Sequence, residues 1–177
     1  MKIGLVCPYD YAYPGGVAAH VPQLEHHFTR MGHYIRILAP YSGNKDALGD
    51  NSVVASSRVA PIPIGGSVSR ISLSPQLPSR VKTLLRKEDL DIVHIHEPVI
   101  PLLSMAALYF SKSVNVGTFH ACHNAPRGYR FCHPLLKGAF ERLDGRIAVS
   151  QPARDFAVRY LPGEYHRFQA LLALAQA

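Results

Sequence analysis

The chain has 177 residues, which fits one domain and is long enough to bury a sizeable hydrophobic core. Hydrophobic residues make up 47% of it and charged residues 18%, a composition that excludes an intrinsically disordered protein. The formal net charge of +7 suits an anionic partner such as nucleic acid, a phosphorylated small molecule or an acidic lipid surface, although a basic surface without a partner has the same composition.

Residues 2–7 form a short, mostly apolar run that ends at Pro8 and predicts a buried parallel strand. A loop follows, and Gly15 and Gly16 then open a segment, 17–31, with the apolar spacing of a helix. Unpaired N–H groups at a helix start favour negative charge, and glycine lets a phosphate or a sugar approach the backbone. The GxGxxG and GxxxxGK[ST] fingerprints are absent, so a tight turn without a ligand remains the alternative.

The rest of the chain alternates between predicted strands and helices, the pattern of an α/β protein with a parallel sheet flanked by helices. Residues 33–40 predict a second strand, which completes a β-α-β unit. Residues 52–64 mix β-branched residues with two prolines and predict one or two short strands near a sheet edge. Further strands are predicted at 91–96, 114–119 and 146–149, and further helices at 75–87, 99–110, 134–143 and 151–160, the last of them capped by Ser150.

The cysteines favour a reduced, cytosolic protein. Cys7, Cys122 and Cys132 are odd in number and lack the spacing of a disulfide framework. The sequence shows no pattern of a secretory signal, and its longest uncharged apolar stretch, 98–110, is too short to span a bilayer.

Polar residues gather just after the predicted strand ends. They are Tyr9, Asp10, His96, Glu97, His120 and Ser150. In open parallel sheets ligands bind outside the carboxyl ends of the strands, so these residues are expected to line one cleft. His120 stands out because a neutral imidazole there can donate to a substrate hydroxyl or polarise a leaving group. A capping or core histidine is the alternative.

Two groups of residues raise the question of a metal. His94 and His96 share one face of their strand, but only Glu97 adds a local ligand, so buried histidines and a carboxylate that fixes the loop are favoured over zinc. A second group combines cysteines and histidines. It lacks the paired C-x-x-C spacing of a zinc site, and no oxyanion hole is evident for a Cys–His nucleophile. Its members are His120, Cys122, His123, Cys132 and His133. We expect no metal and no cofactor.

The predicted helix at 75–87 carries a basic set. The set consists of Arg80, Lys82, Arg86 and Lys87, with Arg70 before it. These residues fall mainly away from the face of Leu77, Val81, Leu84 and Leu85. Such a set either binds anionic headgroups or is a solvated helix face. Nucleic acid is not expected as a partner, because no aromatic platform and no known binding motif accompany the charges.

Several segments together resemble the amino-terminal half of the family 4 retaining glycosyltransferases, and most of all the phosphatidylinositol mannosyltransferases of actinobacteria. They are MKIGLVCPYDYAYPGGVAAHV, ILAP, DIVHIHEPVIPLLSMAAL, VGTFHA and GRIAVSQPARDF, in this order within residues 1–164. The resemblance implies a GT-B enzyme with two Rossmann-like domains and the active cleft between them. This chain would be the acceptor-side half-domain, and the second domain would hold most of the nucleotide-sugar donor.

The resemblance also implies roles for single residues. His120 of the TFH motif contacts the transferred sugar and is catalytic. Gly15 and Gly16 lie against the diphosphate and sugar of the donor. Tyr9 faces the acceptor, a lipid in the mannosyltransferases, and Asp10 is assigned to the acceptor as a substitute for the acid that these enzymes carry before the PGG motif. The basic set Arg80, Lys82, Arg86 and Lys87 lies where these enzymes dock on anionic membrane, which places the protein at the inner face of the membrane.

Three departures from the family pattern follow. Ala12 stands where the mannosyltransferases carry an acid, and ACHNAPRGYR replaces a hydroxyl-rich stretch with a lysine after TFH, which leaves the acceptor open. Residues 165–177 form an apolar tail that favours a helix without strand character, where the family continues into the donor domain. We therefore expect half an enzyme, inactive alone and prone to self-association. The rival interpretation is a non-catalytic module that binds an anionic membrane by its basic face.

Overall fold

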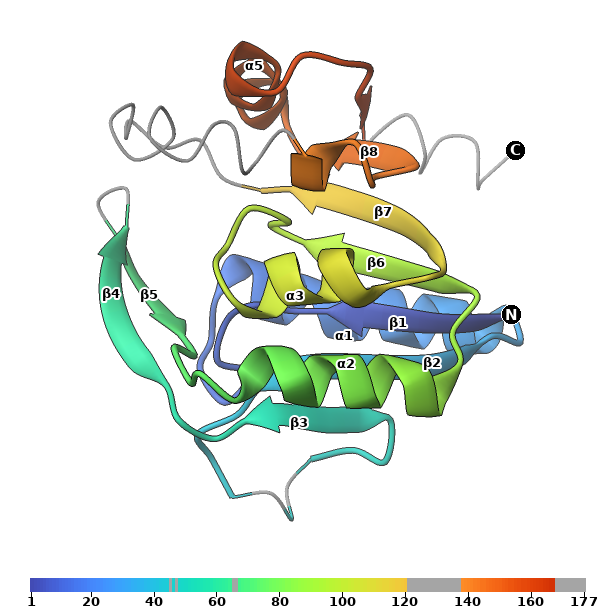
Figure 1. Cartoon of the computed structure of the whole chain (residues 1–177), viewed down its shortest axis with the longest axis vertical. Helices are drawn as coiled ribbons and strands as arrows, with labels where there is room; N and C mark the ends of the chain where they lie inside the picture. The colour runs from blue at the N-terminus through green and yellow to red at the C-terminus, as the bar shows by residue number, and fades with distance from the viewer. Residues whose placement is uncertain (45, 47, 65–66, 121–137, 168–177) are drawn as a thin grey trace.

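A parallel sheet flanked by helices forms the centre of the protein, as predicted. The computed structural model describes residues 1–177 except 45, 47, 65–66, 121–137 and 168–177 (Figure 1). The sheet has seven described strands in the order β3-β2-β1-β6-β7-β8-β9, and every neighbouring pair is parallel. The strands are β1 (Lys2–Val6), β2 (Tyr34–Pro40), β3 (Ser52–Ser56), β6 (Ile92–His96), β7 (Val114–Phe119), β8 (Gly145–Ala148) and β9 (His166–Arg167).

Helices cover both faces of this sheet. Helix α1 (Gly16–Arg30) lies behind the sheet in Figure 1, whereas α2 (Leu77–Glu88) and α3 (Leu103–Phe110) lie in front of it. Helix α5 (Gln151–Tyr160) follows β8, and Ser150 caps it as predicted, since its Oγ accepts the N–H of Ala153 at 3.2 Å. None of the described helices combines the length and the apolar character that crossing a membrane requires.

The alternation of side chains along β1 builds two separate hydrophobic cores. Ile3, Leu5 and Cys7 point to the face covered by α1 and are buried there with Val17 and Val21 of that helix. The opposite face of the sheet packs against α2 and α3 in the second core. That core includes Val6, Leu38, Val93 and Ile95 from the strands and Leu77, Val81, Leu103 and Leu108 from the helices. The predicted apolar faces of α1 and α2 are therefore confirmed.

Strand β1 occupies the point where the strand order reverses. It pairs with β2 on one side and with β6 on the other, because the chain returns from β3 at the sheet edge to the centre through α2. The carboxyl ends of β1, β6, β7 and β8 consequently meet at one edge of the sheet. This is the position at which doubly wound sheets bind their ligands.

An antiparallel hairpin stands apart from the parallel sheet. Strands β4 (Ala60–Ile64) and β5 (Ser67–Ile71) form it, between β3 and α2 in the chain. The prediction for residues 52–64 is confirmed, since β3 lies at the sheet edge, but β5 was not predicted. A bridge between Tyr9 and Ile71 and the hydrogen bond from Asp10 N to Arg70 O, 2.8 Å long, tie the hairpin to the loop after β1.

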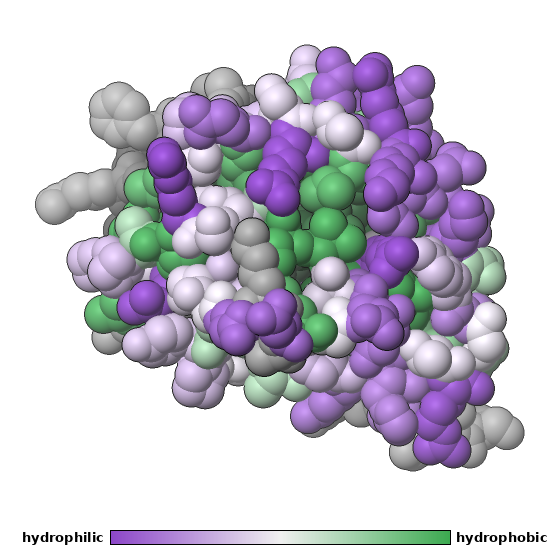
Figure 2. Space-filling model, turned by 90° about the horizontal axis from the view of Figure 1, so that it is seen from below, coloured by the Kyte–Doolittle hydropathy of each residue, from purple (hydrophilic) through white to green (hydrophobic). Residues whose placement is uncertain are grey.

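Strands β3 and β9 form the two ends of the sheet, and β9 was not predicted. Figure 2 shows the end where β3 lies, with hydrophilic residues over most of this face and hydrophobic residues near its centre. At the other end, His166 and Arg167 pair with β8, so the expectation of no strand character after residue 164 is wrong for these two residues. The rest of the expected helical tail, 168–177, and residues 134–137 of the predicted helix at 134–143 lie outside the described residues, whereas residues 138–140 of that helix are helical.

Candidate functional site

A pocket of about 390 Å³ opens where the carboxyl ends of the central strands meet the start of α1. Its lining residues are Tyr9, Gly16, Val17, His20, Glu97, His120 and Val149. They come from the loop after β1, the first turns of α1 and the positions that directly follow β6, β7 and β8. The structure thus brings Tyr9, Gly16 and His120, which were selected from the sequence, into one pocket.

Neither packing nor backbone conformation requires glycine at the start of α1. Gly15 is extended, with φ −171° and ψ 158°, a conformation open to any residue. A Cβ atom built on Gly15 or Gly16 would find no other atom within 4 Å. The helix also begins without a side-chain cap, so its first N–H groups remain available to a negative group. Open space around an uncapped helix start fits a bound anion.

His120 is held at both its backbone and its ring. Its N–H donates to Oε1 of Glu97 at 2.7 Å, and its Nε2 lies 2.9 Å from Nδ1 of His96. Glu97 is buried and has a φ of 48°, a left-handed conformation that non-glycine residues rarely adopt. This turn directs the carboxylate back across the strand ends toward His120. The expectation that Glu97 fixes the loop is therefore confirmed.

Four histidines form a cluster at this pocket, of which His20 and His120 line it, and His20 was missed in the sequence. His20, from α1, places its ring edge-on to the rings of His96 and His120, with centroids 5.7 and 5.4 Å apart. His94 stacks on His96 at 4.7 Å, and its Nε2 lies 2.6 Å from Oγ1 of Thr118. The signal for His20 was available, because it follows Gly16 by one helical turn and so shares the side of the helix that faces the strand ends.

Burial keeps these rings neutral. It lowers the pKa of His94 to about 3, and burial together with repulsion from His20 lowers the pKa of His120 to about 4. Burial also lowers the pKa of His20, and the pKa of His96 falls well below its ordinary value for the same reason. At neutral pH His120 is therefore an uncharged imidazole, which donates at one ring nitrogen and accepts at the other.

Asp10 plays a structural part beside a second pocket. Its carboxylate is buried and accepts the Ser42 hydroxyl at 2.6 Å, the Ser42 N–H at 3.0 Å and the Ala12 N–H at 3.2 Å, and it pairs with Arg70. Burial alone would raise the pKa of Asp10, but these hydrogen bonds together bring it below its ordinary value. Asp10 thus fixes the loop between β1 and α1.

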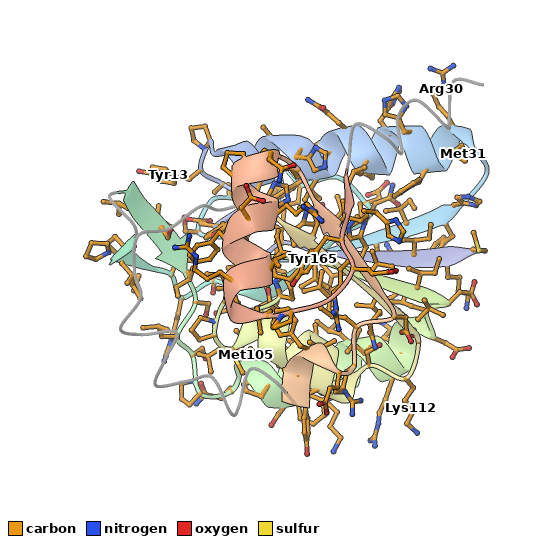
Figure 3. The ribbon with its side chains drawn as sticks, turned by 90° about the horizontal axis from the view of Figure 1, so that it is seen from above. Tyr13, Arg30, Met31, Met105, Lys112 and Tyr165 are labelled. Carbon is orange, nitrogen blue, oxygen red and sulfur yellow. The ribbon has the colours of Figure 1, made fainter. Side chains whose placement is uncertain are left out.

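The second pocket, of about 320 Å³, lies between this loop and the β4–β5 hairpin. Arg70 packs its guanidinium over the ring of Tyr13, 4.0 Å from the centroid, and both residues line the pocket. Figure 3 shows Tyr13 beside the hairpin, at the end of α1 opposite Arg30 and Met31. Because Tyr9 and Gly16 line both pockets, the two form adjoining parts of one surface.

A larger pocket, of about 420 Å³, lies elsewhere. It is lined by the carboxyl-terminal residues of α2 and α3 and by Leu90 and Ser113, which precede β6 and β7. It therefore opens at the amino ends of the strands, where Lys112 is labelled in Figure 3, and takes no part in the site.

The remaining residues selected from the sequence are the basic set on α2 and the candidate metal ligands. The basic set Arg80, Lys82, Arg86 and Lys87 is exposed along α2, outside the buried stripe of Leu77, Val81 and Leu85. Within the described residues no group of three or more His, Cys, Asp or Glu side chains could hold a metal ion. The candidates Cys122, His123, Cys132 and His133 lie outside the described residues.

Comparison with known proteins gives a family match and named relatives. The family model for Glycosyltransferase Family 4 matches residues 14–166. A phosphatidyl-myo-inositol mannosyltransferase from Mycobacterium leprae is 40% identical over 161 residues, which are 91% of this chain and 42% of that protein. One from Propionibacterium freudenreichii is 36% identical over 165 residues, 90% of this chain and 43% of that protein. The chain thus spans about two fifths of the length of these curated relatives.

Solved structures agree on the fold. A glycosyltransferase from Rickettsia africae matches with a TM-score of 0.59 and 15% identity, over 94% of this chain and 42% of that one. A sucrose-phosphate synthase structure from Thermosynechococcus elongatus matches with a TM-score of 0.62 and 13% identity, over 99% and 96% of the two chains. The described structure is accordingly a Rossmann-like half-domain of the GT-B type, as the sequence predicted.

Proposed function

This chain belongs to glycosyltransferase family 4, and on that premise we propose that it is the acceptor-binding half of a retaining enzyme. The whole enzyme transfers a hexose, with mannose favoured by the names of the relatives, from a nucleotide-diphosphate sugar to a lipid or other acceptor. One observation carries the proposal: the uncapped start of α1 at Gly16 and the ring of His120 line the same pocket.

In the proposed site each group has a task that its chemistry suits. The N–H groups after Gly15 and Gly16 stabilise the negative charge of the leaving diphosphate, which approaches the backbone because no side chain intervenes. His120 contacts the transferred sugar as an uncharged hydrogen-bonding group. Donor affinity comes mostly from a second domain, so this half alone is expected to bind the donor weakly and to be inactive.

The acceptor side of the proposal rests on Tyr9 and the pocket beside the hairpin. Tyr9 lines both pockets, and the guanidinium of Arg70 supplies a positive charge that suits the phosphate of a lipid headgroup. Asp10 holds Arg70 in place at this pocket by accepting a hydrogen bond from its Nε–H. An inositol phospholipid is the acceptor that the names of the relatives favour. The exposed basic set on α2 then holds the protein at the inner face of an anionic membrane.

The donor side can be tested on this chain by nuclear magnetic resonance, which detects weak binding. Addition of GDP-mannose or UDP-glucose should shift the backbone amides of Gly16 and Val17 together with the ring signals of His120. Gly16→Val should abolish these shifts, whereas Gly49→Val should leave them, since Gly49 also has open space around it but lies outside this pocket. Unchanged spectra at millimolar concentrations of both donors would contradict the proposed donor site.

The acceptor side needs a comparison of lipids with equal charge. Vesicles that contain phosphatidylinositol should bind the chain more tightly than vesicles with the same amount of phosphatidylglycerol, and soluble inositol phosphate should remove the difference. Equal binding to both kinds of vesicle would favour the rival function, a module that binds any anionic membrane. The exposed cations of α2 are the observation that supports that rival.

A further inference from the structure

We infer that His96 is a positioning residue that holds His120 as its Nδ1–H tautomer, so that the ring nitrogen left for a ligand can only donate a hydrogen bond. The inference rests on the proposed function only for the nature of that ligand. The tautomer itself is a property of this chain and can be observed without a donor or an acceptor.

The first step is the contact between the two rings. Nδ1 of His96 and Nε2 of His120 are 2.9 Å apart, a hydrogen-bond distance. Each neutral imidazole carries one N–H and one bare nitrogen, so one of these two atoms donates and the other accepts. The direction of this single bond therefore decides the tautomers of both residues.

The surroundings of His96 decide the direction. Its side chain is fully buried, and its Nε2 has no hydrogen-bond partner among the described residues. A buried N–H group without an acceptor is more costly than a bare ring nitrogen without a donor. The hydrogen of His96 is therefore on Nδ1, which donates to Nε2 of His120. Because that atom accepts, the neutral ring of His120 carries its hydrogen on Nδ1.

The orientation of His96 is fixed from two sides. Its ring stacks on His94, with centroids 4.7 Å apart and planes 23° from parallel, and His94 is in turn bonded to Thr118. The backbone oxygen of His96 accepts the hydroxyl of Ser104 at 3.1 Å. A ring turned out of its plane would break the stack, and a ring flipped by 180° would remove the nitrogen from His120, so only the observed orientation keeps both contacts.

The backbone of His120 is fixed independently by Glu97, which accepts its N–H at 2.7 Å. With Nε2 engaged by His96, the ring offers Nδ1–H as its remaining hydrogen-bonding group. This group matches a hydroxyl or an ether oxygen of a sugar, both of which accept hydrogen bonds. It cannot remove a proton, so the geometry assigns His120 a binding role toward the sugar and excludes it as a general base in this tautomer.

The test reads the tautomer directly. In protein labelled with ¹⁵N-histidine, long-range proton–nitrogen correlation spectra at neutral pH distinguish a protonated ring nitrogen from a bare one. We expect a protonated Nδ1 and a bare Nε2 for His120, and a protonated Nδ1 for His96. A protonated Nε2 in His120 of the unaltered chain overturns the inference, whatever the variants show.

Two substitutions of His96 separate positioning from general structural support. His96→Leu removes the donor, and His120 should then shift toward the Nε2–H form that free histidine favours. His96→Asn places an amide nitrogen where Nδ1 stood and should restore the Nδ1–H form, because an amide turned the other way would bury its N–H groups without acceptors. Backbone amide spectra report whether each variant folds. A folded His96→Leu variant that keeps the original tautomer contradicts the inference.

The outcomes for this inference and for the proposed function are independent. If GDP-mannose leaves the signals of His120 unchanged while its Nδ1 is protonated, the donor site fails and the tautomer assignment stands. If the donor shifts these signals but Nε2 carries the hydrogen, the function stands and His96 is the acceptor of the bond.

Discussion

The side chains of Asp10 and Arg70 meet at 3.4 Å although 60 positions separate them in the chain. Asp10 lies in the loop that leads from β1 to the glycines of α1, and Arg70 lies in the hairpin that lines the second pocket. The same two residues are also joined through their backbones. This pair therefore couples the two walls of the candidate site.

Asp10→Asn should destabilise the protein by about 1–3 kcal/mol, because a neutral amide cannot accept all the hydrogen bonds that the buried carboxylate receives. Urea unfolding followed by circular dichroism measures the change. Asp155→Asn is the matched control, since Asp155 is exposed on α5, and it should change the stability by less than about 0.5 kcal/mol. Equal stability of both variants would show that the Asp10 contacts do not hold the loop.

Gly16→Ala should separate stability from ligand binding. The new Cβ atom enters open space at the first residue of α1, so the unfolded chain loses freedom and the protein gains about 0.5 kcal/mol. The same atom stands in the proposed path of the diphosphate and should weaken donor binding in the resonance titration. A stabilised variant with unchanged donor shifts would contradict the proposed role of Gly16.

Gly4→Ala should destabilise the protein, in contrast to Gly16→Ala, because the space beside Gly4 is filled. A Cβ atom there would lie 2.5 Å from Cδ1 of the buried Leu90, which must move within a packed core. We expect a loss of about 1–3 kcal/mol in urea unfolding, with donor shifts retained in the folded fraction.

The stability of the protein should fall as the pH falls below about 6.5, the ordinary pKa of histidine. Burial lowers the pKa of His120 to about 4 and that of His94 to about 3, so the unfolded chain binds protons that the native rings refuse. The stabilisation is complete above about pH 6.5 and is lost as the pH falls through these native values. Urea midpoints measured across this window report the slope.

A histidine outside the cluster controls this experiment. His27 is exposed in the last turn of α1, and His27→Gln should leave the pH slope as it is. His94→Gln removes one of the buried rings and should flatten the slope. A slope that is the same in all three proteins would show that the buried cluster does not govern the acid sensitivity.

Neutralising the basic set on α2 should weaken binding to anionic vesicles. Each cation near an anionic surface is worth about 1 kcal/mol, so Lys82→Gln or Arg86→Gln should each reduce affinity about fivefold in sedimentation assays at low salt. Arg30→Gln, an exposed change at the far end of α1 on the opposite face of the sheet, should have little effect. Comparable losses in all three variants would point to overall charge rather than to α2.

Elements whose residues repeat with a clear period could be predicted from the sequence. The strands of the parallel sheet other than β9, the apolar faces of α1 and α2, and the cap at Ser150 were visible because hydrophobic spacing and capping are local properties. The hairpin was seen only in part. Pro61 and Pro63 in β4 obscure its strand character, and β5 is stabilised by pairing with β4 and the loop after β1 rather than by its own pattern.

Long-range contacts at the site could not be predicted in the same way. His120 and Gly16 were selected from position and resemblance, but the bond between His96 and His120 depends on how β6 and β7 align in the sheet. Asp10 was assigned to the acceptor as a substitute for the acid that the family carries before the PGG motif, and only the fold shows its carboxylate engaged with Ser42 and Arg70. Its assignment to the acceptor remains a prediction.

The β4–β5 hairpin leads to a last prediction, on the proposed recognition of the acceptor. It branches from the connection between β3 and α2 and contributes no strand to the parallel sheet, yet it forms one wall of the pocket beside Tyr9. We predict that exchanging β4 and β5 for the equivalent strands of a relative, with Arg70 retained so that it still pairs with Asp10, alters the proposed acceptor preference and leaves the glycines and the histidine cluster in place.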